Sequence, residues 1–366
     1  MPNFYLSKLI LLLAVVLTAF IGGLAGLVSV LIVLAMLYFL GGLDSESKHG
    51  ISEHQSCRLG GVILVVYPAC AVLFQWYVER QAMFTPSGRV LMLGCFGFFI
   101  LGLLEDLTSA LSPRLRLFLM ISGAAMLLVL VPDMRLLPFD IQGVGWALEF
   151  PLAASLLTVI SLTFIVNAFN VADGANGLVS GISLLALGGL MITSASVQVW
   201  PLELFFVSCL IFFCLNVLTG RLFLGDGGAY LLGLVVGTSI IFASNKTDVS
   251  PWFLGMLIFY PTADFFFSIV RRLVTGGSAM SADNRHFHNL VFALLKRAGL
   301  SPQLANTLTG ISIAILWTGS AIALEIHIGD DINWMLVYAL SWLSFITLWW
   351  CMRSLSARWI KEPTLS

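Results

Sequence analysis

Charged residues are scarce in this sequence: Asp, Glu, Lys and Arg make up 10% of its 366 residues, whereas hydrophobic residues make up 59%. A soluble globular chain contains about 25% charged residues, so this composition excludes an ordinary soluble domain. Neither sign is in excess, because eighteen Lys and Arg face nineteen Asp and Glu. The composition therefore gives no basis for nucleic-acid binding and indicates a protein that lies within a membrane.

Cysteine is also sparse, and its six positions show no paired CxxC spacing. Most of them lie within apolar runs, which is typical of small buried hydrophobic residues rather than of disulfides or metal ligands. The positions are Cys57, Cys70, Cys95, Cys209, Cys214 and Cys351.

Long apolar runs dominate the chain, and they lack the two-residue alternation of a membrane β-barrel, so we expect helices. A bilayer core of roughly 30 Å requires about 20 apolar residues for each helical span. The first run, from Leu9 to Leu40, is too long for the core of a signal peptide. Gly22 and Gly23 could break it into two short spans, but we interpret it as one long, tilted span.

Ten further runs follow, and the predicted fold class is an all-α polytopic membrane helical bundle with about eleven transmembrane helices. Residues 1–366 are expected to form a single integral-membrane domain. The ten runs are Gly60 to Val78, Val90 to Leu104, Leu115 to Val131, Leu152 to Ala168, Leu178 to Val197, Leu202 to Leu218, Tyr230 to Ala243, Trp252 to Val270, Leu304 to Ile326 and Trp334 to Met352.

The basic residues predict the orientation of this bundle. With eleven spans the connecting segments alternate between two sides, and thirteen Lys and Arg fall on one side against five on the other. Because cytoplasmic loops carry the excess of Lys and Arg, the N-terminus is expected outside and the C-terminus in the cytoplasm. The predicted cytoplasmic loops are about 41–59, 105–114, 169–177, 219–229 and 271–303.

Carboxylates occur in several of these cytoplasmic loops. Glu105 and Asp106 end the third span, and Asp173 and Asp226 each precede a glycine. Two carboxylates at the end of an apolar helix are costly to ionise unless a cation neutralises them, and hard oxygen ligands favour Mg²⁺ or Mn²⁺. A single Asp-Gly at a helix end is as well explained by a cap or a turn, but three such sites in phase favour a shared function.

A basic segment follows the ninth span and contains Arg271, Arg272, Arg285, His286 and His288. Two histidines without nearby cysteines are weak support for zinc. Arginine and histidine side chains more readily donate charge-assisted hydrogen bonds to diphosphate oxygens. An ordinary solvated basic loop remains an alternative, and positive-inside bias alone would place the two neighbouring arginines here.

One carboxylate, Asp264, lies inside an apolar run rather than at its end. An intramembrane carboxylate is a functional candidate, and a structural hydrogen bond to a neighbouring helix is an equally good explanation. His327, Asp330 and Asp331 fall on the predicted outer side, and we interpret them as part of a solvated loop.

Four segments together resemble the polyprenyl-phosphate N-acetylhexosamine-1-phosphate transferase family, which includes phospho-MurNAc-pentapeptide translocase. The stretch Asn-Ala-Phe-Asn-Val-Ala-Asp-Gly-Ala-Asn-Gly-Leu from Asn167 is the most specific match. The others are Phe223 to Gly228, then Arg271-Arg272 with Asp283 to His288, and more loosely Asp44, His54, Arg58 and Gly60-Gly61.

The resemblance implies that a polyprenyl phosphate attacks the β-phosphorus of a UDP-sugar, giving a lipid diphosphate sugar and UMP, with Mg²⁺ (or Mn²⁺) as cofactor. It implies that the first acid, Glu105, deprotonates or positions the lipid phosphate, and that Asp226 is the principal metal ligand. The full set that it implies is catalytic Glu105, Asp106 and Asp173, metal-binding Asp226 and Asp106, and substrate-binding Asn170, Asn176, Asn216, Arg271, Arg272, Arg285, His286 and His288.

The chain departs from the family pattern at three positions. Glu105 replaces the usual aspartate, Asn176 stands where many members have a second aspartate, and Asn289 follows His288 where some members have a third histidine. These differences could mark a subgroup with another donor sugar or a member of reduced activity.

The expected partners are a UDP-N-acetylhexosamine, undecaprenyl phosphate and membrane lipid, with homo-oligomerisation left open. UDP-GlcNAc is the first expected donor, followed by UDP-GalNAc or a deoxy sugar. The expected location is the bacterial inner membrane with a cytoplasmic active site, at the first step of cell-surface polysaccharide synthesis, as in cell wall or O-antigen lipopolysaccharide. The alternatives are a non-catalytic paralogue and a transporter or lipid carrier, although mid-bilayer ionisable residues, which transport favours, are nearly absent.

Overall fold

The computed structural model describes residues 58–79, 84–138, 145–194, 201–220, 222–276 and 285–361, and every regular element in these ranges is helical. The predicted all-α class is therefore confirmed for this part of the chain. Several predicted features lie outside the described residues, namely the first span from Leu9 to Leu40, the first-loop residues Asp44 and His54, and Cys57 and Asp283.

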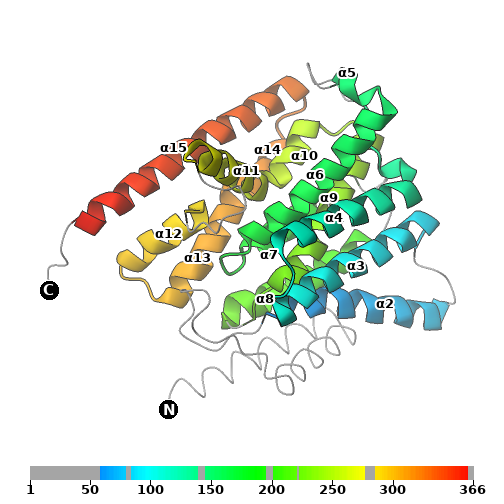
Figure 1. Cartoon of the computed structure of the whole chain (residues 1–366), viewed down its shortest axis with the longest axis horizontal. Helices are drawn as coiled ribbons and strands as arrows, with labels where there is room; N and C mark the ends of the chain where they lie inside the picture. The colour runs from blue at the N-terminus through cyan, green and yellow to red at the C-terminus, as the bar shows by residue number, and fades with distance from the viewer. Residues whose placement is uncertain are drawn as a thin grey trace, which may run out of the picture.

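Fourteen α-helices are described, together with short 3₁₀ turns at Gly60–Val62 (η1) and Pro132–Met134 (η2) and a π-helical turn at Ile315–Gly319 (η4) (Figure 1). The helices are α2 (Ile63–Glu79), α3 (Pro86–Thr108), α4 (Pro113–Leu130), α5 (Gly145–Leu148), α6 (Pro151–Ala172), α7 (Leu178–Thr193), α8 (Leu202–Thr219), α9 (Gly225–Lys246), α10 (Pro251–Leu257), α11 (Phe259–Val274), α12 (Phe287–Arg297), α13 (Pro302–Ala314), α14 (Ser320–Glu325) and α15 (Asp331–Lys361).

Each predicted span within the described ranges coincides with a helix or a helix pair. In the described part of the chain, seven helices are long and apolar enough to cross a membrane, and the bent pair α10–α11 makes up to eight. The predicted spans beginning at Gly60 and Leu178 are apolar helices that are shorter than the rest, Gly60–Leu73 and Leu178–Thr193. The chain is therefore a multi-pass helical membrane protein, while the total of eleven spans and the orientation of the termini stay predictions.

Local sequence signals fix where several helices begin. Proline has no backbone N–H to leave unpaired and is well suited to the first helical position. Side-chain oxygens complete three of these starts. Thr85 accepts the amide of Gly88 at 3.0 Å, Ser112 that of Leu115 at 3.3 Å, and Ser301 that of Leu304 at 3.4 Å. The helices that begin at a proline are α3, α4, α6, α10 and α13.

Helix α9 lies at the centre of the bundle, with 89% of its most apolar window buried, and it packs against α3, α6 and α7 (Figure 1). The contact with α3 is unusually close, because a Cβ atom on Gly102 would overlap the backbone of Asp226 and Gly227. Small residues permit such helix–helix approach in membranes. The result is that the C-terminal end of α3 lies against the first turn of α9.

The predicted span from Trp252 to Val270 is not one straight helix, because α10 and α11 meet at an angle of 81°. Pro261 lacks the amide hydrogen that would bond the carbonyl of Leu257, four residues earlier. That carbonyl instead accepts a hydrogen bond from Thr318 Oγ1 at 3.2 Å. The break thus has a chemical cause and a partner that stabilises it.

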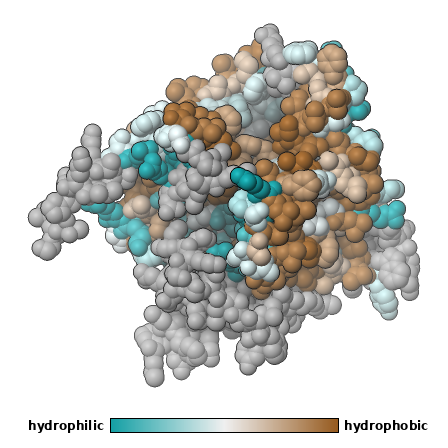
Figure 2. All heavy atoms as spheres, in the orientation of Figure 1, coloured by the Kyte–Doolittle hydropathy of each residue, from teal (hydrophilic) through white to brown (hydrophobic). Residues whose placement is uncertain are grey.

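The surface of the bundle is largely apolar. Figure 2 shows hydrophobic residues covering the face formed by α3, α4 and α6, and hydrophilic residues near α12. Helix α15 has only 11% of its apolar window buried inside the protein. Exposed side chains such as Leu93, Phe118 and Ile160 are what a lipid-facing surface requires.

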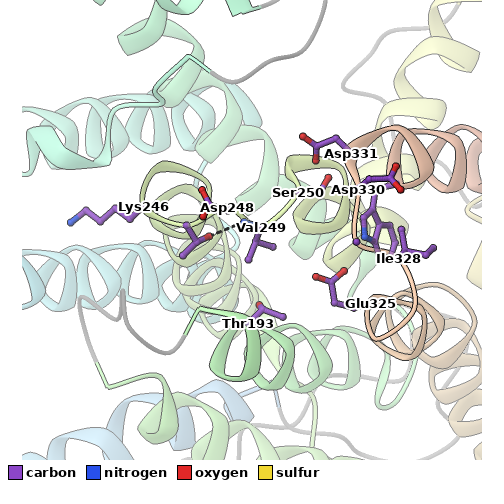
Figure 3. Close-up of a pocket in the computed structure, with 12 residues that line it drawn as sticks. Thr193, Lys246, Asp248, Val249, Ser250, Glu325, Ile328, Asp330 and Asp331 are labelled. Atoms are coloured by element: carbon purple, nitrogen blue, oxygen red, sulfur yellow. Dashed lines mark hydrogen bonds between the residues drawn. The ribbon is translucent and has the colours of Figure 1, made fainter.

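A polar cavity of ≈ 580 Å³ lies at the end of the bundle opposite the start of α9 (Figure 3). It is lined partly by Lys246 and Asp331, and Lys246 is about 30 Å along α9 from Asp226 at 1.5 Å per residue. Asp330, which also lines it, accepts hydrogen bonds from the backbone and side-chain nitrogens of Asn333 at 2.8 and 2.7 Å. It therefore serves as the cap of α15.

The cysteines do not all match the prediction of buried small residues. Among the described residues, Cys70, Cys95, Cys209, Cys214 and Cys351 are free thiols. Two of them, Cys95 and Cys209, are fully buried, while Cys351 is exposed on the outward face of α15. Exposure of Cys351 costs little where the neighbouring surface faces lipid.

Candidate active site

Asp106 joins the end of α3 to the start of α9. Its Oδ1 accepts the backbone amide of Asp226 and its Oδ2 accepts that of Gly227, both at 3.1 Å. These amides belong to the first turn of α9, where helix N–H groups are unpaired and the helix dipole favours negative charge. Asp106 therefore aligns the two helices and carries its charge next to Asp226.

Asp226 lies among hydrogen-bond donors from three other positions. Its Oδ2 is 3.0 Å from Arg116 Nη1 in α4, and its Oδ1 accepts the Asn170 amide at 2.9 Å from α6. Tyr230, one turn later in α9, has its hydroxyl 3.5 Å from Oδ2. These donors, from α4, α6 and α9, hold the carboxylate of Asp226 in one orientation.

Glu105 shares the same arginine. Its Oε1 is 3.6 Å from Arg116 Nη1, and its Oε2 accepts the backbone amide of Leu111 at 3.0 Å. The second bond fixes the loop between α3 and α4, so that the first turn of α4 presents Arg116 to the acids. One guanidinium thus neutralises part of the charge of two carboxylates, Glu105 and Asp226.

Asp173 follows α6 and lies close enough to the other acids to be perturbed by them. Burial, followed by the negative charges of Asp226 and Asp106, raises the pKa of Asp173 to about 8 against the opposing positive charge of Arg58. Within the described part of the chain its carboxylate has no hydrogen-bonding partner. Asp173 is therefore the acid in this cluster that most needs an added cation.

The donor set of this cluster fits a magnesium-type ion. The candidate ligands are carboxylate oxygens, which hard cations prefer. Among the described residues no three His, Cys, Asp or Glu side chains form a metal cage. Magnesium is usually held by one or two carboxylates and completes its shell with water and substrate phosphates, so Asp226 and Asp106 suffice in number.

The loop between α6 and α7 is held by three buried asparagines. Asn216 Oδ1 accepts the amide of Gly177 at 2.6 Å, and its Nδ2 donates to Leu222 O at 2.7 Å and to Asn176 Oδ1 at 3.3 Å. Asn306 Oδ1 accepts the amide of Asn176 at 2.9 Å. Asn176 and Asn216, predicted as substrate-binding residues, are 3% and 4% exposed, and the bonds described here are to the protein itself.

The two histidines lie beside this loop and each has a buried partner in α11. His286 Nδ1 is 2.6 Å from Asp264 Oδ2, and His288 Nδ1 is 2.9 Å from the Tyr260 hydroxyl. The His288 Nε2 is so near Gly174 that a Cβ atom there would overlap it. The histidine pair is therefore adjacent to Asp173, and the structure brings the acidic and basic segments together.

The arginines near the histidines bind the protein framework. Arg271 Nη1 donates to the backbone oxygen of Arg285 at 2.9 Å, and its guanidinium lies 4.8 Å from the ring centre of Trp349. Arg272 Nε donates to the backbone oxygen of Ser268 at 3.0 Å. These contacts fix the start of α12 against α11 and α15, beside the predicted phosphate site.

Sequence reasoning missed several of these residues. Arg116 was visible only as one of many cytoplasmic arginines, although it follows the Glu105–Asp106 pair by one short loop. Tyr230 carried a clearer signal, because residues four apart on a helix share a face and it follows Asp226 by four. Asp264, left open between a functional and a structural role, is the partner of His286.

Comparison with known proteins agrees with this geometry. Residues 89–244 match the model of glycosyl transferase family 4. Over these residues the chain is similar to glycosyl transferase family 4. The match covers α3 to α9, which carry Glu105, Asp106, Asp173 and Asp226, and the predicted family is confirmed.

Several relatives of this chain are named as transferases. The chain is 27% identical over 78% of its length to a probable undecaprenyl-phosphate N-acetylglucosaminyl 1-phosphate transferase of Bacillus subtilis, covering 78% of that protein. It is 27% identical to the undecaprenyl-phosphate alpha-N-acetylglucosaminyl 1-phosphate transferase of Yersinia pestis, over 80% of each chain. The similarly named Thermotoga maritima protein is 34% identical, over 52% of this chain and 57% of its own.

Proposed function

We propose that this protein transfers an N-acetylhexosamine 1-phosphate from a UDP-sugar to undecaprenyl phosphate at the cytoplasmic face of a bacterial inner membrane. The observation that carries the proposal is the meeting of Glu105, Asp106, Asp173 and Asp226 at one end of α3, α6 and α9, next to His286 and His288. The names of the relatives supply the substrate class, and UDP-GlcNAc is the first donor to test.

The proposed reaction joins two anions. An oxygen of the lipid phosphate attacks the β-phosphorus of the donor, a new P–O bond forms, and the bond between that phosphorus and the bridging oxygen breaks. The electron pair leaves with UMP, so that the products are a lipid diphosphate sugar and UMP. Such a transfer depends on positioning and on neutralising charge rather than on covalent chemistry by the protein.

Asp226 and Asp106 would hold a Mg²⁺ ion, which when bound supplies positive charge to the diphosphate oxygens. Arg116 holds the carboxylates of Glu105 and Asp226 in place from one side. Asn170 fixes the other oxygen of Asp226 through its amide. Each of these bonds restricts an acid to one orientation before the reactants arrive. The free-energy cost of ordering the acids during the reaction is therefore lower.

Glu105 is the acid proposed to orient or deprotonate the lipid phosphate. It lies in the last turn of α3, and its neighbour Leu104 is 47% exposed on a helix whose outer face is apolar. A lipid phosphate approaching from the bilayer would therefore meet Glu105 at the helix end. His286 and His288 would contact the donor diphosphate from the opposite, α12 side.

The proposal is tested by exchange of labelled UMP into UDP-GlcNAc, with purified protein, undecaprenyl phosphate and Mg²⁺. Exchange is expected, and EDTA should abolish it. Asp226→Asn should reduce the rate by at least about 100-fold, because a charge that stabilises the transition state is removed. Asp248→Asn, at an exposed position two residues beyond the C-terminal end of α9, is the matched control and should keep the rate.

The panel of donors should include UDP-GalNAc and deoxy N-acetylhexosamines, with the product identified by mass. Absence of exchange with every UDP-N-acetylhexosamine would contradict the proposal. In that case a non-catalytic role would be favoured for a chain in which Glu105 and Asn176 replace family aspartates.

A further inference from the structure

We propose that Asp264 and Tyr260 are positioning residues that hold His286 and His288 in opposite tautomers, so that the two histidines present different groups to a phosphate ligand. In this assignment His286 carries hydrogen on Nδ1 and leaves Nε2 as an acceptor, whereas His288 carries hydrogen on Nε2 and is a donor. The inference deepens the proposed function, because it concerns the residues expected at the donor diphosphate.

The assignment for His286 follows from its carboxylate partner. Asp264 is 1% exposed, and an ionised carboxylate can only accept hydrogen bonds. Its Oδ2 lies 2.6 Å from His286 Nδ1, so Nδ1 must carry a hydrogen. Its Oδ1 accepts the backbone amide of Phe287 at 2.9 Å, which fixes the carboxylate in this orientation.

The assignment for His288 follows from counting hydrogens around one phenol. The Tyr260 oxygen accepts the backbone amide of His288 at 3.2 Å and lies 2.9 Å from His288 Nδ1. The phenolic hydrogen needs an acceptor, and among the described residues His288 Nδ1 is the one within reach. Because Nδ1 then accepts, the ring hydrogen of neutral His288 must lie on Nε2.

The two rings are arranged to act on one ligand. They are stacked with centroids 5.5 Å apart and planes 5° from parallel. His288 Nε2 faces Gly174, next to Asp173, and among the described residues no protein group bonds His286 Nε2. Burial lowers the pKa of His288 to about 4, which agrees with a ring that stays neutral.

The consequence is a division of roles within one short motif. His288 would donate its Nε2–H to a phosphate oxygen without carrying charge. His286, oriented by Asp264, would present Nε2 as a hydrogen-bond acceptor to a hydroxyl group of the same ligand. The chain would thus place one acceptor and one neutral donor side by side, which two histidines with the same kind of partner could not provide.

The test is the tautomer itself, read by nitrogen NMR of full-length, ¹⁵N-histidine-labelled protein in nanodiscs at pH 8. His286→Gln and His288→Gln variants assign the two rings. We expect Nδ1–H for His286 and Nε2–H for His288. The same tautomer in both rings, or the reverse assignment, would overturn the inference.

Two variants show that the partners cause these states. In Asp264→Asn the oxygen must still accept the Phe287 amide, so its NH₂ group faces His286 Nδ1 and should switch that ring to Nε2–H. Tyr260→Phe removes the donor to His288 and should give a mixture of tautomers for that ring only. If each ring keeps its wild-type tautomer in the corresponding variant, neither partner is a positioning residue.

Tyr338→Phe is the matched control, because Tyr338 contacts Phe259 in the same aromatic cluster and neither histidine. It should leave both tautomers unchanged. Exchange rates should fall about tenfold in Tyr260→Phe, as expected for the loss of one hydrogen bond. The NMR measurement does not require turnover, so the two proposals can fail separately. An inactive protein with the expected tautomers would contradict only the proposed function. An active protein with other tautomers would contradict only this inference.

Discussion

At the scale of single residues, the cluster is a set of negative charges that the protein compensates unevenly. Arg116 bonds Asp226 and lies near Glu105, and helix amides bond Asp106, but Asp173 has no such partner among the described residues. Functional groups are often kept in environments that reduce stability. Asp173 has the least compensation, so it is the acid at which a charge kept for function should lower the stability of the fold.

Asp173→Asn should make the metal-free protein more stable. The pKa of Asp173 is raised from 3.8 to about 8, so between these values the unfolded chain has released a proton that the folded chain keeps. Stability is therefore lost as the pH rises through this window. In EDTA at pH 8.5 the variant should melt higher, by roughly 2 to 4 °C for each kcal/mol regained.

The same comparison at pH 4 should show little difference, because Asp173 is then protonated in the folded state and close to half protonated in the unfolded state, so that little stability has yet been lost. Asp248→Asn, at the exposed site just beyond the C-terminal end of α9, should show no pH-dependent gain. An equal gain for Asp173→Asn at pH 4 and pH 8.5 would contradict an origin in proton binding.

Arg116→Gln should lower the Mg²⁺ concentration needed for half-maximal exchange. The guanidinium bonds the carboxylate of Asp226, the proposed metal ligand, at 3.0 Å, so it would compete with a bound cation for this group. The maximal rate should fall about tenfold or more, since the acids lose an orienting partner. Titrating Mg²⁺ in the exchange assay measures both effects. A higher Mg²⁺ requirement would show that Arg116 assists rather than competes with the metal.

Sequence reasoning reached the acids but not their partners, for a physical reason. Glu105 and Asp226 stand out because a carboxylate beside an apolar run is costly and rare. Arg116 does not stand out, because any cytoplasmic loop attracts arginine. Likewise Asn216 was placed among the substrate-binding residues, yet its bonds to Gly177 and Leu222 follow from packing that no local pattern reveals.

At the scale of helices, apolar run length located the spans well because each must bury its backbone in lipid. It did not reveal the bend between α10 and α11, although Pro261 was a local signal for it. It also did not predict which helices touch. The contact of α3 with α9 depends on Gly102 facing Gly227, and a glycine in a membrane helix is too common to identify a contact by itself.

Gly102→Ala should disrupt the site without touching a substrate. The added Cβ would overlap the backbone of Asp226 and Gly227, which cannot rotate away as a side chain can. Overpacking of this kind costs about 1 to 3 kcal/mol, and the shift would pull Asp106 from the α9 amides that it caps. Both the melting temperature and the exchange rate should fall.

Gly97→Ala is a control on the same helix, because its Cβ would meet nothing within 4 Å. It should leave the exchange rate unchanged and keep or slightly raise the melting temperature, since alanine favours helix over glycine by up to about 1 kcal/mol. Equal loss in both variants would show that α3 tolerates no added methyl group, whatever it faces.

At the scale of the whole molecule, the two ends of the bundle differ in chemistry. The acids and histidines gather at the start of α9, and the cavity that includes Lys246 and Asp331 lies at its other end. The separation of about 30 Å along α9 matches the thickness of a bilayer core. If the excess of Lys and Arg sets the orientation, the first end is cytoplasmic and the second faces outward.

Cysteine labelling in intact cells tests this orientation. In a Cys351→Ser background, which removes an exposed native thiol, Asp331→Cys should react with a membrane-impermeant maleimide added outside. Arg297→Cys, at the end of α12 on the histidine side, should react only after the membrane is permeabilised. UDP-sugars are hydrophilic and cannot cross lipid unaided, so a cytoplasmic donor requires the acid cluster on that side. Reversed labelling would put the cluster outside and would be incompatible with both the predicted topology and a cytoplasmic nucleotide-sugar donor.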